Sequence, residues 1–476
     1  QEAELLLPLI EMQLDNRAIQ RFYDNWAVIT YETQNIPALK QLAAAIGRMG
    51  ERRSSALLLG TGLLFQAMEK FSTHEYPEGL IIVDQALRYL RETGDLAVIL
   101  HALDRKSKFL YMLTQFPEAK SILEEGFAIL PEELDNELLV ISARLYHDYA
   151  NLLILMGFPA EGMEYSEKAH RAYIQANHLE GQAKVFAQMV ISSVYTSQNI
   201  KAEQEAEFGL TLAQRSGHLR VAALMRTYNA VAKACRGKMD QAWELTNEAM
   251  TAGRSFPFPE IEAFCYQTRG DICRYLHDYQ EAATLYAKAL DIQAGDFVKC
   301  DLLSRLGLVV GLQGNLMQGS AHLSAAHKMS IDLNIGGYTL TSRVHQFIID
   351  PSLQNLAAGE SELEDLRHEA TTRQLFSYAS ILQLLQSRLA YLRGDAQAGT
   401  DLFNLALSAP IQVEGIWPGL IHLILQTIPQ DDVPAAVRHM WKEKAIFYMD
   451  IIAPGCKSVP MKKKWQMLRQ TIDKQA

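Results

Sequence analysis

Apolar residues recur with helical spacing along nearly the whole chain, and the alternating runs that would predict strands are almost absent. The clearest stretch is Ala263 to Gly295, in which two helices are predicted on either side of a short polar turn. Small residues such as Gly270 and Ala282 would let the two helices approach closely, and Tyr286 would fill the space between them. The sequence therefore predicts an all-α protein built from helix pairs.

The same turn pattern recurs with a nearly constant period. An apolar or aromatic residue lies in each predicted turn between paired helices, and the spacing of successive turns is nearly uniform as far as Leu316. The gap that follows, from Leu316 to Ala396, is twice as long and leaves room for one degenerate copy around Asn355 to Gly359. These turn residues are Ile36, Tyr76, Phe116, Phe158, Ile200, Met239, Tyr279, Leu316 and, more weakly, Ala396. A period of about 40 residues predicts a one-dimensional array of helix pairs.

The stretch from Ala263 to Gly295 resembles a tetratricopeptide repeat (TPR). The residues that carry the resemblance are Gly270, Tyr279, Ala282, Tyr286 and Ala289. It departs from the TPR pattern at Arg269, where Leu is usual, and at Ala294, where a closing Pro is usual. The resemblance implies an α-solenoid, a right-handed superhelix of about 9–10 TPR-like helix pairs with a helical C-terminal cap.

The regularity of the pattern predicts three segments. Residues 1–334 form a TPR-like helical array, and residues 335–409 are a degenerate continuation of it. Residues 410–476 are interrupted by prolines and are predicted to form a helical cap with a basic tail.

Composition places the chain among ordinary foldable proteins, with 49% apolar and 21% charged residues. The net charge of −10 argues against a chain that binds nucleic acid over its whole surface. No apolar run reaches the roughly 18 residues of a membrane span, and the acidic start does not resemble a signal peptide. The five cysteines form no C-x-x-C pair, so free thiols and a cytoplasmic location are expected. Because the chain begins with Gln1, we expect a piece of a longer protein.

Motifs for common catalytic chemistry are missing from the sequence. It contains no G-x-x-x-x-G-K-[ST], no H-E-x-x-H and no G-x-S-x-G. The dipeptides His147-Asp148 and His277-Asp278 could ligate a metal, but the second lies in a predicted turn where polar residues are expected. We therefore predict no enzyme activity, no cofactor and no metal.

A binding face is predicted instead. The first helices of stacked TPR pairs line a concave groove that commonly takes an extended peptide or a helix. Counting positions from the predicted turns gives the inward-facing residues of two pairs. They are His101, Asp104, Lys108 and Tyr111 in one pair and Phe264, Gln267, Asp271 and Arg274 in another. The alternative is that these side chains belong to ordinary solvated helix faces.

The C-terminal tail is basic, with nine Lys or Arg and three acidic residues from Val437 onward. The run Lys462, Lys463, Lys464 and Trp465 could touch nucleic acid or an acidic surface. A run this short is more often a solvated helix end, and a contact with the acidic body of the same chain is a further alternative.

The long period and the Gly-containing stops between copies resemble the helical-repeat sensor arm of signal-transducing ATPases of the maltotriose-responsive activator type. That resemblance implies a regulatory arm that binds an inducer or partner. The leading hypothesis is a non-enzymatic scaffold or sensor that binds a protein segment, peptide or small effector in its groove. The alternatives are the regulatory arm of a larger enzyme, such as a caspase-like protease or an ATPase, and nucleic-acid contact through the tail.

Overall fold

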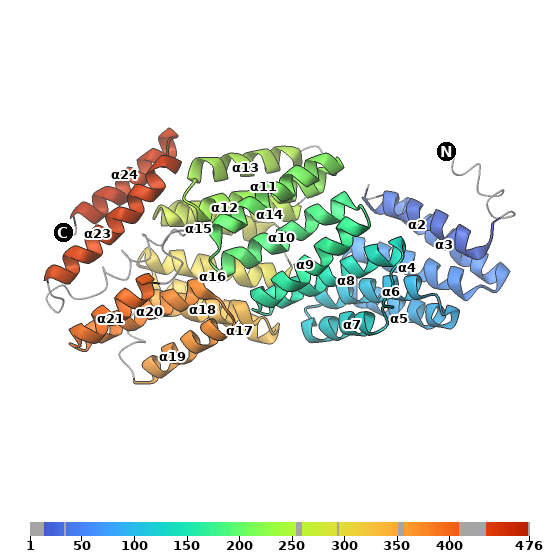
Figure 1. The fold of residues 1–476 in the computed structure, drawn as a ribbon, viewed down its shortest axis with the longest axis horizontal. Helices are drawn as coiled ribbons and strands as arrows, with labels where there is room; N and C mark the ends of the chain where they lie inside the picture. The colour runs from blue at the N-terminus through green and yellow to red at the C-terminus, as the bar shows by residue number, and fades with distance from the viewer. Residues whose placement is uncertain are drawn as a thin grey trace. The chain divides into compact units, whose positions relative to one another are not determined.

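The computed structural model describes residues 14–32, 35–253, 259–292, 295–350, 357–408 and 435–474. These residues form twenty-two α-helices and no strand (Figure 1). The chain divides into two compact units at Tyr149/Ala150. The predicted all-α solenoid is confirmed.

Unit 1 contains the consecutive helix pairs α2/α3, α4/α5 and α6/α7, and the first part of α8. Their bounds are α2 (Asn16–Glu32), α3 (Ile36–Arg53), α4 (Ala56–Ser72), α5 (Tyr76–Thr93), α6 (Leu96–Met112), α7 (Phe116–Ala128) and α8 (Asn136–Leu155).

Unit 2 continues the same arrangement and ends with a separate helical hairpin. Its helices are α9 (Pro159–Gln175), α10 (Leu179–Tyr195), α11 (Asn199–Ser216), α12 (Leu219–Cys235), α13 (Met239–Gly253), α14 (Pro259–Tyr275), α15 (Tyr279–Asp291), α16 (Asp296–Leu312), α17 (Leu316–Asp332), α18 (Gly336–Ile349), α19 (Ala357–Thr372), α20 (Phe376–Leu392), α21 (Ala396–Ser408), α23 (Ala435–Ile452) and α24 (Val459–Lys474). The short 3-10 helix η4 (Ala453–Gly455) joins the last two.

The predicted turn residues mark the start of the second helix in each pair. Ile36, Tyr76, Phe116, Met239 and Tyr279 are the first residues of α3, α5, α7, α13 and α15. The degenerate copy predicted near Asn355 to Gly359 is also present, because α19 begins at Ala357. The predicted period is therefore confirmed as one helix pair per repeat.

Local sequence explains where the helices begin and end. Proline occupies the first turn of α5, α7 and α9, where the missing N–H has no partner to lose. The second residue after the end of many first helices adopts a left-handed conformation, as at Gly237 with φ of 77° and His277 with φ of 57°. This conformation ends the helix and lets the chain reverse in a short turn.

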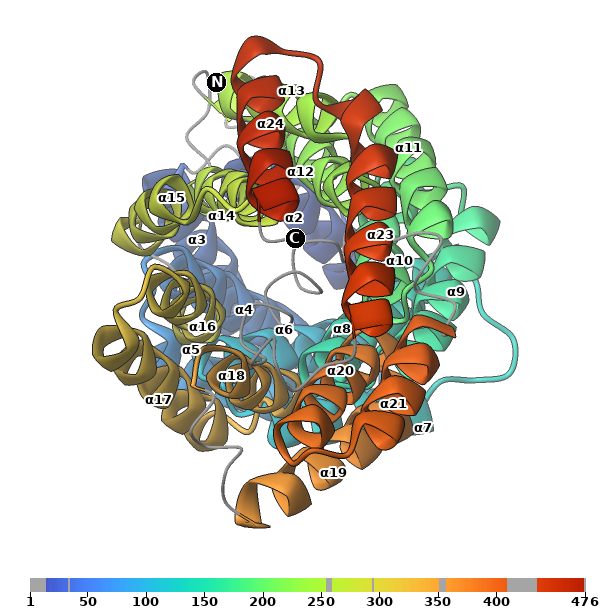
Figure 2. The ribbon, with the colours of Figure 1, turned by 90° about the vertical axis from the view of Figure 1, so that its left-hand side faces the viewer.

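The even-numbered helices form the inner face of each unit. They contact the next even-numbered helix more extensively than odd-numbered helices contact each other: α2 with α4 in unit 1, and α10 with α12 or α16 with α18 in unit 2. In a curved stack, helices on the inside of the curve are closest together, and Figure 2 shows the even-numbered helices of unit 2 on that side. The face of the even-numbered helices is called the inner face below.

The hairpin of α23 and α24 packs against the helices in the middle of unit 2. Ala445, Met449 and Ile452 share an apolar cluster with Ala234 and Ile272. The side chain of Asp240 accepts hydrogen bonds from the backbone N–H groups of Lys457 and Ser458. Residues 410–434 of the predicted cap lie outside the described residues, and its capping role stays a prediction.

The backbones of the hairpin and of unit 2 also approach closely. A Cβ on Gly455 would clash with the carbonyl oxygen of Gly237, so the turn between α23 and α24 has room only for glycine at this position. The hairpin is therefore seated on the turn between α12 and α13.

A contact within unit 2 joins segments that are far apart in sequence. Arg373, just after α19, donates from Nη1 to the carbonyl oxygen of Met156 at 2.9 Å. Its guanidinium also lies 5.1 Å from the centre of the Phe158 ring. Nearby, a Cβ on Gly157 would lie 3.0 Å from the backbone nitrogen of Gly337. The turn that precedes α9 therefore meets the turns that flank α18 and α19, and the array of unit 2 closes on itself.

The predicted segment boundaries at 334/335 and 409/410 concern the regularity of the repeats, and they stay predictions. None of the described helices is long and apolar enough to cross a membrane.

Candidate functional site

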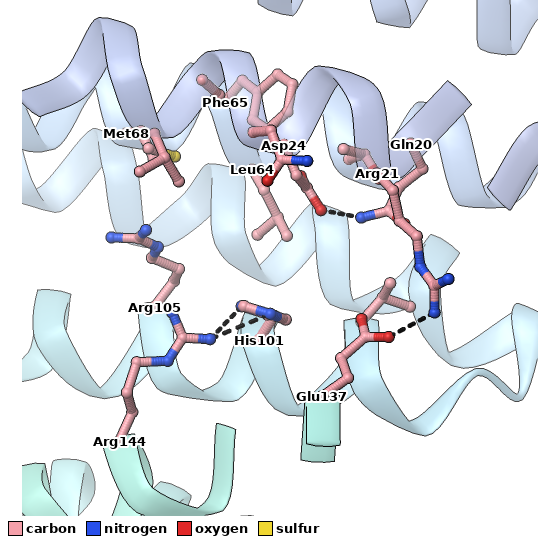
Figure 3. A pocket seen from close by; sticks show the side chains of 15 residues that line it. Gln20, Arg21, Asp24, Leu64, Phe65, Met68, His101, Arg105, Glu137 and Arg144 are labelled. Atoms are coloured by element: carbon pink, nitrogen blue, oxygen red, sulfur yellow. Dashed lines mark hydrogen bonds and ion pairs between the residues drawn. The ribbon is translucent and has the colours of Figure 1, made fainter. Parts of the chain in front are cut away.

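A pocket of about 350 Å³ opens on the inner face of unit 1 (Figure 3). Its described walls come from the first helices of consecutive pairs, α2, α4, α6 and α8. The apolar part consists of buried side chains on neighbouring helices: Ala27, Leu64, Phe65, Met68 and Val98. A space of this size takes a small molecule or one to two residues of a peptide.

The two ends of the pocket carry different polar groups. At one end Arg21 donates to Glu137 at 2.7 Å, and Arg17 reaches the other carboxylate oxygen at 3.0 Å. At the opposite end, next to Met68, lie Arg105 and Arg144 (Figure 3). The carboxylate at the first end is thus saturated by two guanidinium groups.

Arg105 and Arg144 have no carboxylate within ion-pair distance among the described residues. The guanidinium of Arg105 lies 5.9 Å from the centre of the Tyr31 ring. Nη2 of Arg144 lies 2.9 Å from Nδ1 of His101, and its Nε is buried without a hydrogen-bond partner in the described part of the chain. Two positive charges therefore face the pocket with donors to spare.

The other titratable groups of the pocket do not neutralise this charge. Burial and the nearby Arg144 lower the pKa of His101 well below its ordinary value, so the ring is neutral at pH 7. Burial raises the pKa of Asp24 to about 7 in spite of Arg17 and Arg105, so its carboxyl is about half protonated at neutral pH. The pocket keeps a net positive charge, since its lining has Arg21, Arg105 and Arg144 against Glu137 and a half-charged Asp24.

Of the first predicted groove set, His101 lines this pocket and the others lie further along α6. The carboxylate of Asp104 is fully buried and accepts two hydrogen bonds from Lys108 at 2.8 and 2.9 Å. Nζ of Lys108 also lies 3.3 Å from Asp148 of α8. Tyr111 stacks edge-on against Phe116. The polar groups of Asp104 and Lys108 are therefore occupied by internal contacts.

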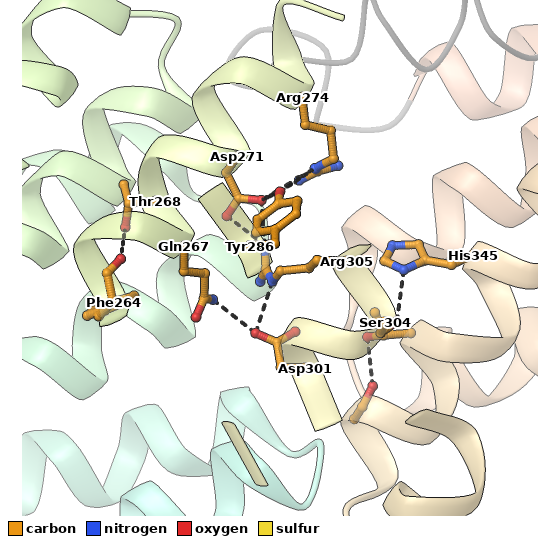
Figure 4. A network of polar contacts seen from close by, with 12 residues as sticks. Phe264, Gln267, Thr268, Asp271, Arg274, Tyr286, Asp301, Ser304, Arg305 and His345 are labelled. Carbon is orange, nitrogen blue, oxygen red and sulfur yellow. Dashed lines mark hydrogen bonds and ion pairs between the residues drawn. The ribbon is translucent and has the colours of Figure 1, made fainter. Parts of the chain in front are cut away.

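The second predicted set lies on the inner face of unit 2, in a network that joins α14, α15, α16 and α18 (Figure 4). Asp271 accepts from the Tyr286 hydroxyl at 2.7 Å, from Arg274 at 3.0 Å and from Arg305 at 2.6 Å. Arg305 also donates to Asp301 at 2.9 Å, and Gln267 donates to the same carboxylate at 2.9 Å.

The network is balanced in charge and its groups satisfy one another. Burial would raise the pKa of Asp271, but Arg305 and Arg274 outweigh it and hold the pKa below its ordinary value. Burial lowers the pKa of His345, which lies 2.9 Å from the Ser304 hydroxyl, to about 3, and the ring is neutral. Two carboxylates and two guanidinium groups thus compensate each other. Phe264 packs edge-on against Tyr228 and contributes no polar group.

The basic tail is split between internal contacts and solvent. Lys464 forms ion pairs with Asp278 and Glu281 in the turn and first residues of α15. Trp465 donates from its indole N–H to the carbonyl oxygen of Met449 at 2.9 Å. Lys462 and Lys463 are exposed. The internal contact with the acidic body, one of the predicted possibilities, is confirmed for Lys464.

Sequence reasoning missed most residues of both clusters. Arg105, Arg144, Asp24, Phe65 and Met68 lie on four different helices, and Asp301 and Arg305 lie one pair beyond the predicted Asp271. The turn spacing carries the signal that could find them. Counting from the turns in the helix pairs on either side of the two predicted pairs points to these helices. No group of three or more His, Cys, Asp or Glu suited to a metal occurs among the described residues.

Comparison with known proteins gives the fold. No known protein family and no curated sequence matches the chain. The structure is similar to a Rap protein complexed with competence and sporulation factor, with a TM-score of 0.56, 12% identity, and coverage of 76% of this chain and 99% of that one. It is also similar to NprR in complex with its cognate peptide NprX, with a TM-score of 0.54, 14% identity, and coverage of 70% and 97%. The chain therefore has a TPR-like helical-repeat fold.

Proposed function

We propose that the chain is a non-enzymatic sensor or scaffold that binds a peptide segment or a small effector on the inner face of unit 1. The observation that carries the proposal is the pocket itself. Four first helices build it with an apolar part and two guanidinium groups, of Arg105 and Arg144, which have no carboxylate partner in the described part of the chain. The complexes of a Rap protein with competence and sporulation factor and of NprR with its cognate peptide are compatible with this use of the fold.

For the inner face of unit 2, we propose a structural role. Its charged groups already pair with one another, so a ligand there would have to break buried ion pairs at a cost of several kcal/mol. We assign the network to holding α14, α15 and α16 in register. Gln267, Asp271 and Arg274 are thus proposed as structural residues, in place of the partner contact that the sequence predicted.

The other hypotheses remain as alternatives. A role as the regulatory arm of a larger enzyme, or of a signal-transducing ATPase, is compatible with the same pocket, because such an arm would also bind an effector. Nucleic-acid contact through the tail is less favoured, since Lys464 and Trp465 are engaged within the chain.

Binding can be tested with a selected peptide and a blocked pocket. A peptide is first selected from a displayed random library against the intact chain, and its affinity is measured by fluorescence anisotropy. Asn25→Trp places a large ring at an exposed position of the pocket lining and should weaken binding at least tenfold. Gln41→Trp, at an exposed position of α3, is the matched control and should bind like the parent. Equal affinity of the Asn25→Trp protein and the parent would place the binding site elsewhere.

A further inference from the structure

The pocket of unit 1 has a polarity that restricts its ligand. One end is a pair of cationic groups, Arg105 and Arg144, and the middle is the apolar floor of Leu64, Phe65 and Met68. At the far end, Glu137 already accepts hydrogen bonds from Arg17 and Arg21, so its carboxylate does not need a cationic group of a ligand. A ligand that matches all three parts has an anionic group at one end and an apolar body.

The donors at the cationic end favour a planar anion. A guanidinium group presents N–H donors in a fixed fork that matches the two oxygens of a carboxylate. Arg144 has a buried Nε without a partner among the described residues, and its Nη2 is held against His101. The contact with His101 fixes the position of this guanidinium before any ligand arrives, which reduces the entropy lost on binding.

The size of the pocket sets an upper limit on the apolar body. A volume of about 350 Å³ accommodates a chain of several methylene groups or one large aliphatic side chain, but no folded domain. Val28, which is 52% exposed at the pocket lining, leaves one side open to solvent. A longer ligand could continue out of the pocket along that side.

We propose that the pocket of unit 1 binds an apolar carboxylate, with the carboxylate on Arg105 and Arg144 and the apolar body on Leu64, Phe65 and Met68. The proposal rests on the function proposed above and specifies the chemistry of its ligand. Two sources supply this chemistry: a free aliphatic acid, and the C-terminal residue of a peptide that ends in an apolar side chain.

Titration calorimetry with the intact chain tests the chemistry. Octanoate is compared with 1-octanol, which has the same apolar body without the charge, and acetyl-Gly-Leu is compared with its C-terminal amide. We expect at least one of the two acids to bind with one-to-one stoichiometry and at least tenfold more tightly than its uncharged partner. Binding of octanoate alone identifies a free acid as the source, and binding of acetyl-Gly-Leu alone identifies a peptide terminus.

Variants then locate the site. Arg105→Gln and Arg144→Gln should each weaken binding of the acid about tenfold or more, while Arg88→Gln, an exposed arginine on α5, should leave it unchanged. If the two pocket variants do not fold, Val28→Asp and Val28→Lys at the exposed rim give a second test. The added carboxylate should weaken binding of the acid and the added ammonium should strengthen it.

The contrary outcomes separate this inference from the proposed function. Equal binding of octanoate and 1-octanol, or acid binding that none of these variants changes, would overturn the carboxylate assignment. Absence of binding by both acids would overturn it as well. In each case a selected peptide that still loses affinity with Asn25→Trp would leave the proposed function standing.

Discussion

Arg305 is the residue on which the inner-face network of unit 2 depends most, since it contacts both carboxylates. Replacing it by Gln leaves Asp271 and Asp301 buried with too little positive charge nearby. Breaking a buried pair in this way typically costs about 3–5 kcal/mol. We expect Arg305→Gln to lower the free energy of unfolding of unit 2 by that amount, as measured by urea unfolding.

Arg367→Gln is the matched control for that experiment. Its partner Glu364 lies on the same helix, three residues away, and is half exposed. Exposed pairs contribute about 0–1 kcal/mol, so this variant should unfold nearly like the parent. If the two variants had equal effects, the network of Arg305 would be no more important than a surface ion pair.

The stability of unit 1 should depend on pH through Asp24. Its pKa is raised by burial from 3.8 to about 7 in the folded chain, so the folded state holds the proton more tightly than the unfolded state. The stability that the protonated carboxyl confers is complete below about pH 4 and is lost as the pH rises to 7 and above. Because Asp24 lies at intermediate burial in the pocket lining, we expect a loss of about 1–3 kcal/mol in unit 1 between pH 4 and pH 8.

Asp24→Asn should remove this part of the pH dependence, and hydrogen exchange of α2 and α4 at pH 5 and pH 8 would measure it. Asp148 also has a raised pKa, of about 7, so some dependence will remain in the variant. Glu92→Gln, at an exposed position of α5, should keep the full dependence of the parent. An unchanged pH dependence in Asp24→Asn would show that its carboxyl ionises normally.

At the scale of elements, the tight contact between α14 and α15 tests the repeat register. Ala282 is fully buried in a cluster with Cys273 and Tyr286. Ala282→Trp should overpack this cluster and cost about 1–3 kcal/mol or more in thermal unfolding. Ala287→Trp places the same side chain on the exposed face of α15 and should have little effect. Similar melting of the two variants would mean that Ala282 does not face α14.

The helix pairs were predictable because their information is local. Turn residues such as Tyr279 and the prolines at the start of α5 and α7 act through their own backbone, and the helix starts follow them. The pocket was not predictable in the same way. Asp24, Phe65, His101 and Arg144 come from four successive repeats, and their meeting depends on how far each helix is rotated about its axis.

The spacing of residues along α6 predicts which side chains share a face, but not what they contact. His101, Asp104 and Lys108 are spaced so that they share a face of α6, and of these three His101 lines the pocket. The i,i+4 spacing that puts Lys108 on this face also lets it bond to Asp104, so the same pattern that suggests a ligand contact supplies an internal one. Only the neighbouring helices decide which of the two occurs.

At the scale of the molecule, the contact between Arg373 and the turn at Met156 to Phe158 closes the array of unit 2. Arg373→Ala removes a charged donor and a stacking contact, which together contribute about 1–3 kcal/mol. We expect faster hydrogen exchange in both α9 and α18, although these helices are far apart in sequence. Arg393→Ala, an exposed arginine paired with Glu360, should affect α19 and α20 only. Unchanged exchange in α9 would show that the contact does not couple the two ends.

This closure also bears on how the array can change in evolution. An open solenoid can gain or lose a repeat by duplication or deletion, because each repeat contacts only its neighbours. In unit 2, an added or missing helix pair between α9 and α18 would move Arg373 away from Met156 by the width of a repeat. Keeping this contact therefore fixes the number of repeats in the unit. Evolutionary variants of the chain that keep it should differ in loop length and side chains, while the number of helices stays the same.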